Sequence, residues 1–93
     1  MENKSDEHFV YILRCADKTL YTGYARDLKK RLSEHNGKSK IEGAKYTRSR
    51  RPVKLMYHEV FECRSDAQQR EYAVKQLSRP QKLALIQTKK LST

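Results

Sequence analysis

The spacing of apolar residues marks three segments of this chain as β-strands. Residues 9–13 form a continuous apolar run of strand length, and residues 19–22 are rich in strand-forming side chains. A turn-like stretch separates them, so together they predict an antiparallel hairpin whose second strand ends at Gly23. Residues 53–61 begin with apolar side chains at alternate positions, which is the pattern of a strand with one buried face.

Between the hairpin and the third strand, the pattern changes to helical spacing. Asp27 lies at the entry to a helix over residues 26–36, where a carboxylate suits the helix dipole. The pair Asn36-Gly37 suits the left-handed backbone at a helix C-terminus, so we expect the helix to close there. Residues 38–51 contain few apolar side chains and many basic ones, which predicts a surface loop.

The last third of the chain predicts two more helices. Residues 65–77 carry an apolar stripe, and Ser65 and Asp66 are suited to cap the start of that helix. Ser78 precedes a proline by two positions, which predicts a new N-cap and a third helix over residues 79–88.

The predicted order is strand-strand-helix-strand-helix-helix, which describes an α+β fold. We expect a small antiparallel three-stranded sheet flanked by helices. The domain is expected to span residues 9–88, with a polar N-terminal extension at 1–8 and a C-terminal tail at 89–93. A chain of 93 residues suits one such domain with a modest core.

Three polar residues interrupt the apolar stripes of the first two helices. Arg31 follows Leu28 by three positions and His35 follows Leu32 by three, so both lie on the same side of the first helix. Glu71 falls on the apolar stripe of the second helix. Since a lone buried charge is costly unless it is paired or bound to metal, the three residues indicate a functional site. The alternative is a structural ion pair between Arg31 and Glu71.

Composition limits the setting in which the protein acts. No apolar run approaches the roughly 20 residues of a membrane span, and Met1 to His8 are polar and acidic, unlike a signal peptide. We therefore expect a cytoplasmic protein without a membrane partner. Cys15 and Cys63 are far apart and fit no metal-ligand spacing, so we expect free thiols that pack as small apolar groups.

The basic charge of the chain is concentrated in one region. The formal net charge is +10, and residues 26–54 contain eleven Lys or Arg and only three acidic residues. Such a field attracts polyphosphates at long range and gives affinity that depends on salt but not on sequence. This distribution favours nucleic-acid binding over a merely solvated basic surface or a ribosome-associated protein.

The hairpin and the helices together carry a family resemblance. The set that carries it consists of Tyr11, Tyr21, Gly23, Arg31, His35 and Glu71. In this order, and on these expected elements, the set resembles the GIY-YIG nuclease domain over nearly the whole chain, from about Phe9 to Ile86. Val10 replaces the glycine of the first tripeptide and Thr22 the isoleucine of the second, and both are good strand residues. Residues 43–47 and 75–79 look closest to small, stand-alone bacterial members.

The resemblance implies a set of catalytic roles. Glu71 would hold a single divalent cation, Mg²⁺ or Mn²⁺, and Arg31 would bind the scissile phosphate. Tyr11 would accept the proton of the attacking water, which requires its pKa to fall from the usual value near 10. Tyr21 and His35 would assist with proton transfer or water positioning. Whether Tyr11 or His35 is the general base stays open.

The resemblance also implies contacts with the substrate. Gly23 would let the backbone turn sharply or approach the phosphate closely. Side chains of the basic loop would contact the nucleic-acid backbone or stack on a base, the alternative being a solvated loop. These side chains belong to Lys45, Tyr46, Arg48, Arg50 and Arg51.

Taken together, these features predict a metal-dependent DNA endonuclease, with repair or recombination as its setting. The chain leaves no room for an attached specificity domain, so recognition is expected to rest on charge and on DNA structure. The alternative is a non-catalytic nucleic-acid-binding module that keeps the nuclease fold.

Overall fold

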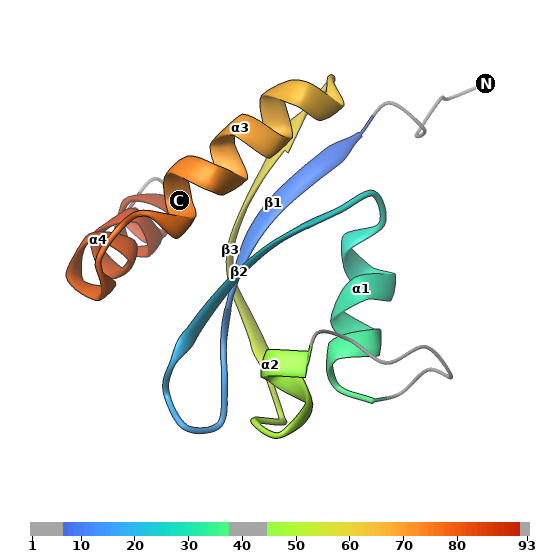
Figure 1. Ribbon diagram of the computed structural model, residues 1–93. Helices are drawn as coiled ribbons and strands as arrows, with labels where there is room; N and C mark the ends of the chain where they lie inside the picture. The colour runs from blue at the N-terminus through green and yellow to red at the C-terminus, as the bar shows by residue number, and fades with distance from the viewer. Residues whose placement is uncertain (1–6, 38–44, 92–93) are drawn as a thin grey trace.

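A computed structural model describes residues 7–37 and 45–91 of the chain, and it shows a three-stranded antiparallel sheet (Figure 1). The strands are β1 (His8–Arg14), β2 (Leu20–Ala25) and β3 (Lys54–Phe61). Their order in the sheet is β2-β1-β3, so β1 is the central strand and pairs with both neighbours. The predicted antiparallel hairpin is the β1–β2 pair.

The second strand is longer than the sequence pattern predicted. We expected it to end at Gly23, but β2 continues to Ala25, so this prediction is wrong. Gly23 pairs directly with Tyr11 in the register of the hairpin. The glycine therefore lies between paired residues of the strand and does not form a turn. Its lack of a side chain affects the packing of the residue opposite.

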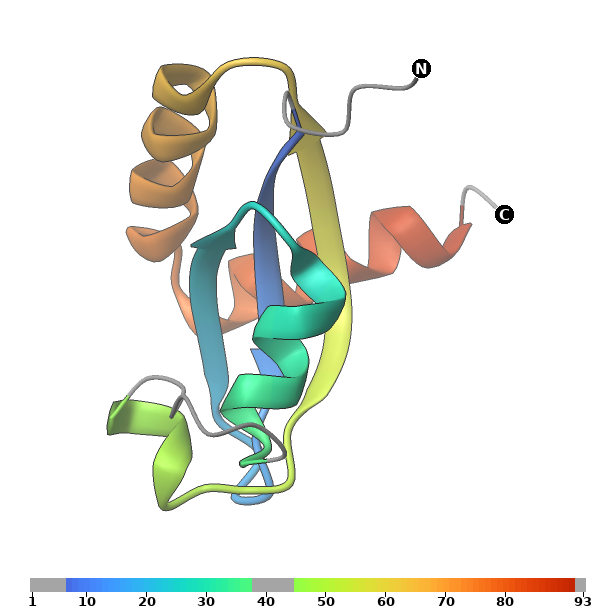
Figure 2. The ribbon, with the colours of Figure 1, turned by 90° about the vertical axis from the view of Figure 1, so that its right-hand side faces the viewer.

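Helices lie on both sides of the sheet, as Figures 1 and 2 show. Two helices lie on one side and two on the other: α1 (Leu28–His35) and α2 (Lys45–Arg48), then α3 (Arg64–Lys75) and α4 (Arg79–Leu91). The α+β class and the three-stranded sheet are confirmed. The short helix α2 was not predicted, because it lies within the segment that was expected to be a loop.

Local capping explains where α1 begins and ends and where α4 begins. The backbone N–H of Lys30 donates to the Asp27 carboxylate at 3.0 Å, so Asp27 caps α1 as predicted. Asn36 is the C-cap of α1, and Gly37 follows with a φ of 75°, a value that favours glycine. At the start of α4, the Ser78 hydroxyl accepts from the backbone N–H of Gln81 at 3.3 Å.

Two boundaries differ from the prediction. The cap of α3 is Cys63, in extended conformation and without a side-chain capping bond, so the expected cap at Ser65 and Asp66 is wrong. Helix α4 continues to Leu91, beyond the predicted end at Thr88. Among the described residues, no helix is long and apolar enough to cross a membrane.

Alternation along the strands gives the sheet two cores. Val10 and Ile12 of β1 pack with Ala67 and Val74 on the side of α3 and α4. Tyr11 and Leu13, at the alternate positions of β1, belong to the second core, which includes residues of α1. Tyr11 is therefore on the α1 side of the central strand, surrounded by structure on all sides.

Candidate active site

Tyr11 stands at one end of a buried line of hydrogen bonds. Its side chain is 1% exposed, and its hydroxyl lies 2.9 Å from Nε2 of His35 on α1. The other ring nitrogen of His35, Nδ1, lies 2.7 Å from the Thr47 hydroxyl on α2. His35 and Thr47 are both fully buried. Sequence reasoning missed Thr47, because no periodic signal marks a helix of four residues.

The burial of His35 determines its charge. Loss of solvation, followed by the nearby Arg31 guanidinium, lowers the pKa of His35 to about 4, so the ring is neutral at pH 7. A neutral imidazole carries one N–H and one acceptor nitrogen. Both contacts are satisfied if Nδ1–H donates to Thr47 and Nε2 accepts from the Tyr11 hydroxyl. His35 then has the lone pair that could receive a proton from Tyr11.

The environment of Tyr11 opposes the simplest general-base role. Burial and the neighbouring Tyr21 raise the pKa of Tyr11 above its ordinary value, and Glu71 adds to this rise. Arg31 acts in the opposite direction and lowers the pKa of Tyr11. The role implied by the resemblance needs a lowered pKa, so in this structure Tyr11 is a protonated hydroxyl that donates to His35.

Tyr21 forms the aromatic wall of the same cluster. Its ring meets that of His35 edge-on at 5.2 Å, and it stacks with Tyr46 at 5.8 Å between ring centroids. Tyr46 is 36% exposed, and the guanidinium of Arg50 lies 4.0 Å from its ring centroid. The aromatic stack therefore runs from the buried histidine to the surface at α2.

Gly23 provides the space that Tyr11 occupies. A Cβ at position 23 would lie 2.4 Å from the Tyr11 hydroxyl oxygen and 2.5 Å from Cζ of its ring. Because the ring is buried and its hydroxyl is bonded to His35, it cannot move away freely. The structure thus gives Gly23 a packing role, in addition to the phosphate approach that the resemblance implies.

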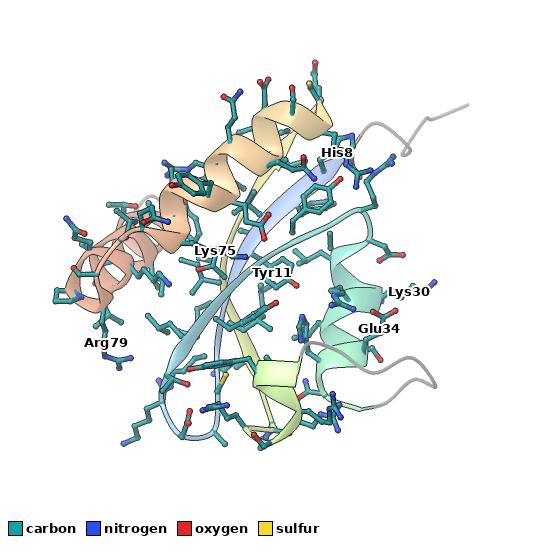
Figure 3. All side chains as sticks on the ribbon, viewed as in Figure 1. His8, Tyr11, Lys30, Glu34, Lys75 and Arg79 are labelled. Atoms are coloured by element: carbon teal, nitrogen blue, oxygen red, sulfur yellow. The ribbon has the colours of Figure 1, made fainter. Side chains whose placement is uncertain are left out.

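Arg31 does not pair with Glu71. Its Nη1 donates to the Glu34 carboxylate at 2.6 Å, and 30% of its side chain is exposed. Arg31, Lys30 and Glu34 help to line an open hollow of about 240 Å³ along α1. Figure 3 shows Lys30 and Glu34 on this helix. The guanidinium is therefore held in place by Glu34 while one side remains accessible to an anion.

Glu71 lies on α3 and approaches the same cluster from the other side. Its carboxylate Oε2 lies 3.2 Å from Nζ of Lys75, one turn along the helix, and 21% of its side chain is exposed. Figure 3 shows Lys75 on α3 extending toward the strands, in the direction of Tyr11. Among the groups that act on the pKa of Tyr11, Glu71 has the smallest effect, and it raises that pKa.

The donor set fits a hard cation that is only partly held by protein. Within residues 7–37 and 45–91, no group of three or more His, Cys, Asp or Glu side chains is arranged to hold a metal. Glu71 supplies one partly exposed carboxylate. Mg²⁺ is commonly held by one or two carboxylates, with water and substrate phosphates completing its ligands, so a single glutamate is sufficient.

Side chains of the basic loop form more hydrogen bonds within the protein than the sequence suggested. Arg50 donates to the Asp17 carboxylate and to the Tyr46 carbonyl, both at 2.9 Å. Arg51 donates from Nε to the His35 carbonyl at 2.7 Å, which anchors the C-terminal end of α1. Arg48 is exposed, and the side chain of Lys45 lies outside the described structure.

Comparisons with known proteins found a matching family model and several similar chains. The model of the GIY-YIG catalytic domain matches residues 7–84. A UPF0213 protein of Staphylococcus saprophyticus is 52% identical over 81 residues, which cover 87% of this chain and 95% of that protein. The solution structure of a UPF0213 protein from Bacillus halodurans has a TM-score of 0.58 at 44% identity, covering 89% of this chain and 85% of that one. The solution structure of a protein from E. faecalis has a TM-score of 0.62 at 42% identity, covering 98% and 93%.

Proposed function

Because the chain belongs to the GIY-YIG family, we propose that it is a metal-dependent DNA endonuclease. The observation that carries the proposal is that several candidate catalytic groups act on one hydroxyl, that of Tyr11. Tyr11 contacts His35 directly, and both Arg31 and Glu71 act on its pKa. An acid, a guanidinium and a proton-accepting ring around one hydroxyl are what hydrolysis of a phosphodiester requires. The proposed setting is DNA repair or recombination in the cytoplasm.

Two charged side chains would act at the reacting phosphate, one through the cation and one directly. Glu71 would hold the divalent cation, proposed to be Mg²⁺ or Mn²⁺, once Lys75 gives up its contact with Oε2. When bound, the cation would supply positive charge to the phosphate and make a water more acidic. Arg31, oriented by Glu34, would present its planar fork to the phosphate oxygens.

The buried line of hydrogen bonds offers a path for a proton. The Tyr11 oxygen accepts the proton of the attacking water as its own hydroxyl proton passes to Nε2 of His35. His35 becomes cationic, a form that burial and the Arg31 guanidinium disfavour and that the Glu34 carboxylate favours, so the proton must leave His35 readily after the step. Such a relay does not require a free phenolate, so it is compatible with the raised pKa of Tyr11. Tyr21 would hold the His35 ring in orientation by its edge-on contact.

The proposal is tested by cleavage of a labelled set of DNA molecules. Single-stranded, duplex, nicked and branched DNA would be incubated at low salt with magnesium or manganese, using wild type and Glu71→Gln. Asp66→Asn, which removes an exposed carboxylate from the first turn of the same helix, is the matched control. We expect products that need the metal, persist in Asp66→Asn and are lost in Glu71→Gln.

Two other outcomes would contradict the proposal. Cleavage by Glu71→Gln in the presence of a chelator would exclude this mechanism. Salt-sensitive binding to every DNA in the set, without cleavage of any, would instead favour the non-catalytic binding module.

A further inference from the structure

A second basic surface lies away from the loop that sequence reasoning favoured. The β1–β2 hairpin, β3 and α4 enclose a groove of about 360 Å³. Three cationic side chains line it, from Arg14, Lys18 and Arg79. The described residues that line it include no acid. Figure 3 shows Arg79 at the beginning of α4, apart from Lys30 and Glu34 on α1.

Apolar side chains form another part of the groove's lining. Leu20, Met56 and Leu83 contribute to its lining, and Leu83 is 43% exposed. Nη1 of Arg79 donates to the Lys18 carbonyl at 2.7 Å, which ties α4 to the hairpin and holds the Arg79 guanidinium in place. The lining of the groove thus combines positive charge with apolar surface.

Further cationic side chains lie between the groove and the candidate active site. Arg79 also lines a neighbouring hollow of about 220 Å³ that contains Lys82. Lys82 is close enough to Lys75 for their charges to repel, which adds to the effect of burial in lowering the pKa of Lys82. Lys75 in turn contacts Glu71 at 3.2 Å. The positive charge therefore continues from the groove to the proposed metal ligand.

Charge and apolar surface together identify the occupant. Phosphates attract the cations, in keeping with a chain of net charge +10. In a duplex the bases are stacked and paired, so their faces cannot rest on Leu20 and Leu83. An unpaired nucleotide can place its phosphate against the cations and its base on the apolar side chains. We propose that the groove binds a single-stranded segment of DNA that adjoins the cleaved bond. This inference rests on the proposed nuclease function and gives it a substrate class, DNA with an unpaired extension.

Binding measurements without cleavage test the groove directly. Anisotropy titrations in chelator would compare a duplex bearing a short single-stranded tail with a blunt duplex that has the same number of phosphates. Arg14→Gln combined with Arg79→Gln, which removes two of the groove's cations, should weaken binding of the tailed DNA roughly tenfold and leave blunt DNA much less affected. The slope of the logarithm of the binding constant against the logarithm of the salt concentration should become shallower by about 1.4. This is the value for two phosphate contacts with a single strand.

Two controls separate the groove from general loss of charge and from unfolding. Lys29→Gln combined with Arg64→Gln removes two exposed charges from the first turns of α1 and α3, and it should not change the preference for the tail. Leu83→Ala keeps every charge and should reduce the preference for a normal tail over one that lacks bases. Equal losses on tailed and blunt DNA, or no preference in wild type, would overturn the proposal.

Cleavage of the same tailed and blunt DNA distinguishes a failure of this proposal from a failure of the nuclease proposal. If wild type cleaves both DNAs equally and the groove variants cleave as well as wild type, the groove proposal fails and the nuclease stands. If wild type shows the predicted tail preference in binding but cleaves neither DNA with magnesium or manganese, the nuclease fails and the groove stands as a binding site.

Discussion

The two sides of the candidate site are built in different ways. On the side of α1 and α2, Tyr11, His35 and Thr47 are at most 1% exposed and are joined by hydrogen bonds of 2.9 and 2.7 Å. On the side of α3, Glu71 and Lys75 keep 21% and 50% of their side-chain surface exposed and meet in an ion pair at 3.2 Å. The first side is fixed before substrate arrives, whereas the second can exchange partners.

This difference matches the tasks that we assign to each side. Transfer of a proton depends on short, aligned contacts, which a packed interior maintains. Binding of a cation and a phosphate requires groups that can give up one partner for another, and an exposed ion pair contributes little to stability. The packed side should therefore respond to mutation through folding as well as activity, and the exposed side mainly through activity.

The largest effect on stability should come from pH and the buried histidine. His35 has a pKa of about 4 in the folded protein and an ordinary value near 6.5 when unfolded. As pH falls from about 6.5 to 4, the unfolded chain binds a proton that the folded chain does not, so stability is lost. The expected loss from this residue is about 3 kcal/mol in the free energy of unfolding.

Urea unfolding at several pH values measures this loss. His35→Gln removes the titrating ring, so its stability should be lower near neutral pH and fall less steeply between pH 6.5 and 4. A pH dependence as steep in the variant as in wild type would show that His35 is not the group responsible.

A smaller effect should follow from Gly23→Ala. The new Cβ would meet the Tyr11 hydroxyl and ring at 2.4 and 2.5 Å, and overpacking of this kind costs about 2 kcal/mol. Displacement of Tyr11 should also reduce cleavage. In a Tyr11→Leu background the same alanine should cost much less stability, because the obstructing ring is absent. Equal costs in both backgrounds would mean that Gly23 matters for another reason.

The smallest effect on stability should follow from Lys75→Met. The exposed ion pair with Glu71 should contribute less than about 1 kcal/mol, so the unfolding midpoint in urea should change little. Because Glu71 loses its competing cation, the apparent affinity for Mn²⁺, measured by paramagnetic resonance without DNA, should rise. An unchanged or weaker affinity for Mn²⁺ would contradict the view that Lys75 competes for this carboxylate.

The sequence was informative where the signal is local. Asp27, Gly37 and Ser78 each act on the backbone within a few residues, so the ends of the helices that they cap could be predicted. Positions of Arg31, His35 and Glu71 on helix faces follow from spacing alone. These local rules were sufficient for the order of elements apart from α2.

The sequence was uninformative where the partner is distant. Contact between Thr47 and His35 depends on a four-residue helix after a segment with no periodic pattern. Whether Arg31 pairs with Glu71 depends on how α1 and α3 sit across the sheet. The ion pairs that form instead, Arg31 with Glu34 and Glu71 with Lys75, are three and four residues apart within one helix, a spacing that the sequence does show. The packing role of Gly23 required the hairpin register, which places it opposite Tyr11. The contact of Thr47 and the packing role of Gly23 are not encoded by spacing along one element.

The central claim is that the fixed and the exposed sides form one active site. A double-mutant cycle with Tyr11→Phe and Glu71→Gln, measured by single-turnover cleavage with magnesium, tests it most directly. Each single variant should lose on the order of a thousandfold in rate, and the double variant should lose little more than the worse single variant, because both act in one step. Losses that multiply, or full activity in either single variant, would show that the two sides do not work together.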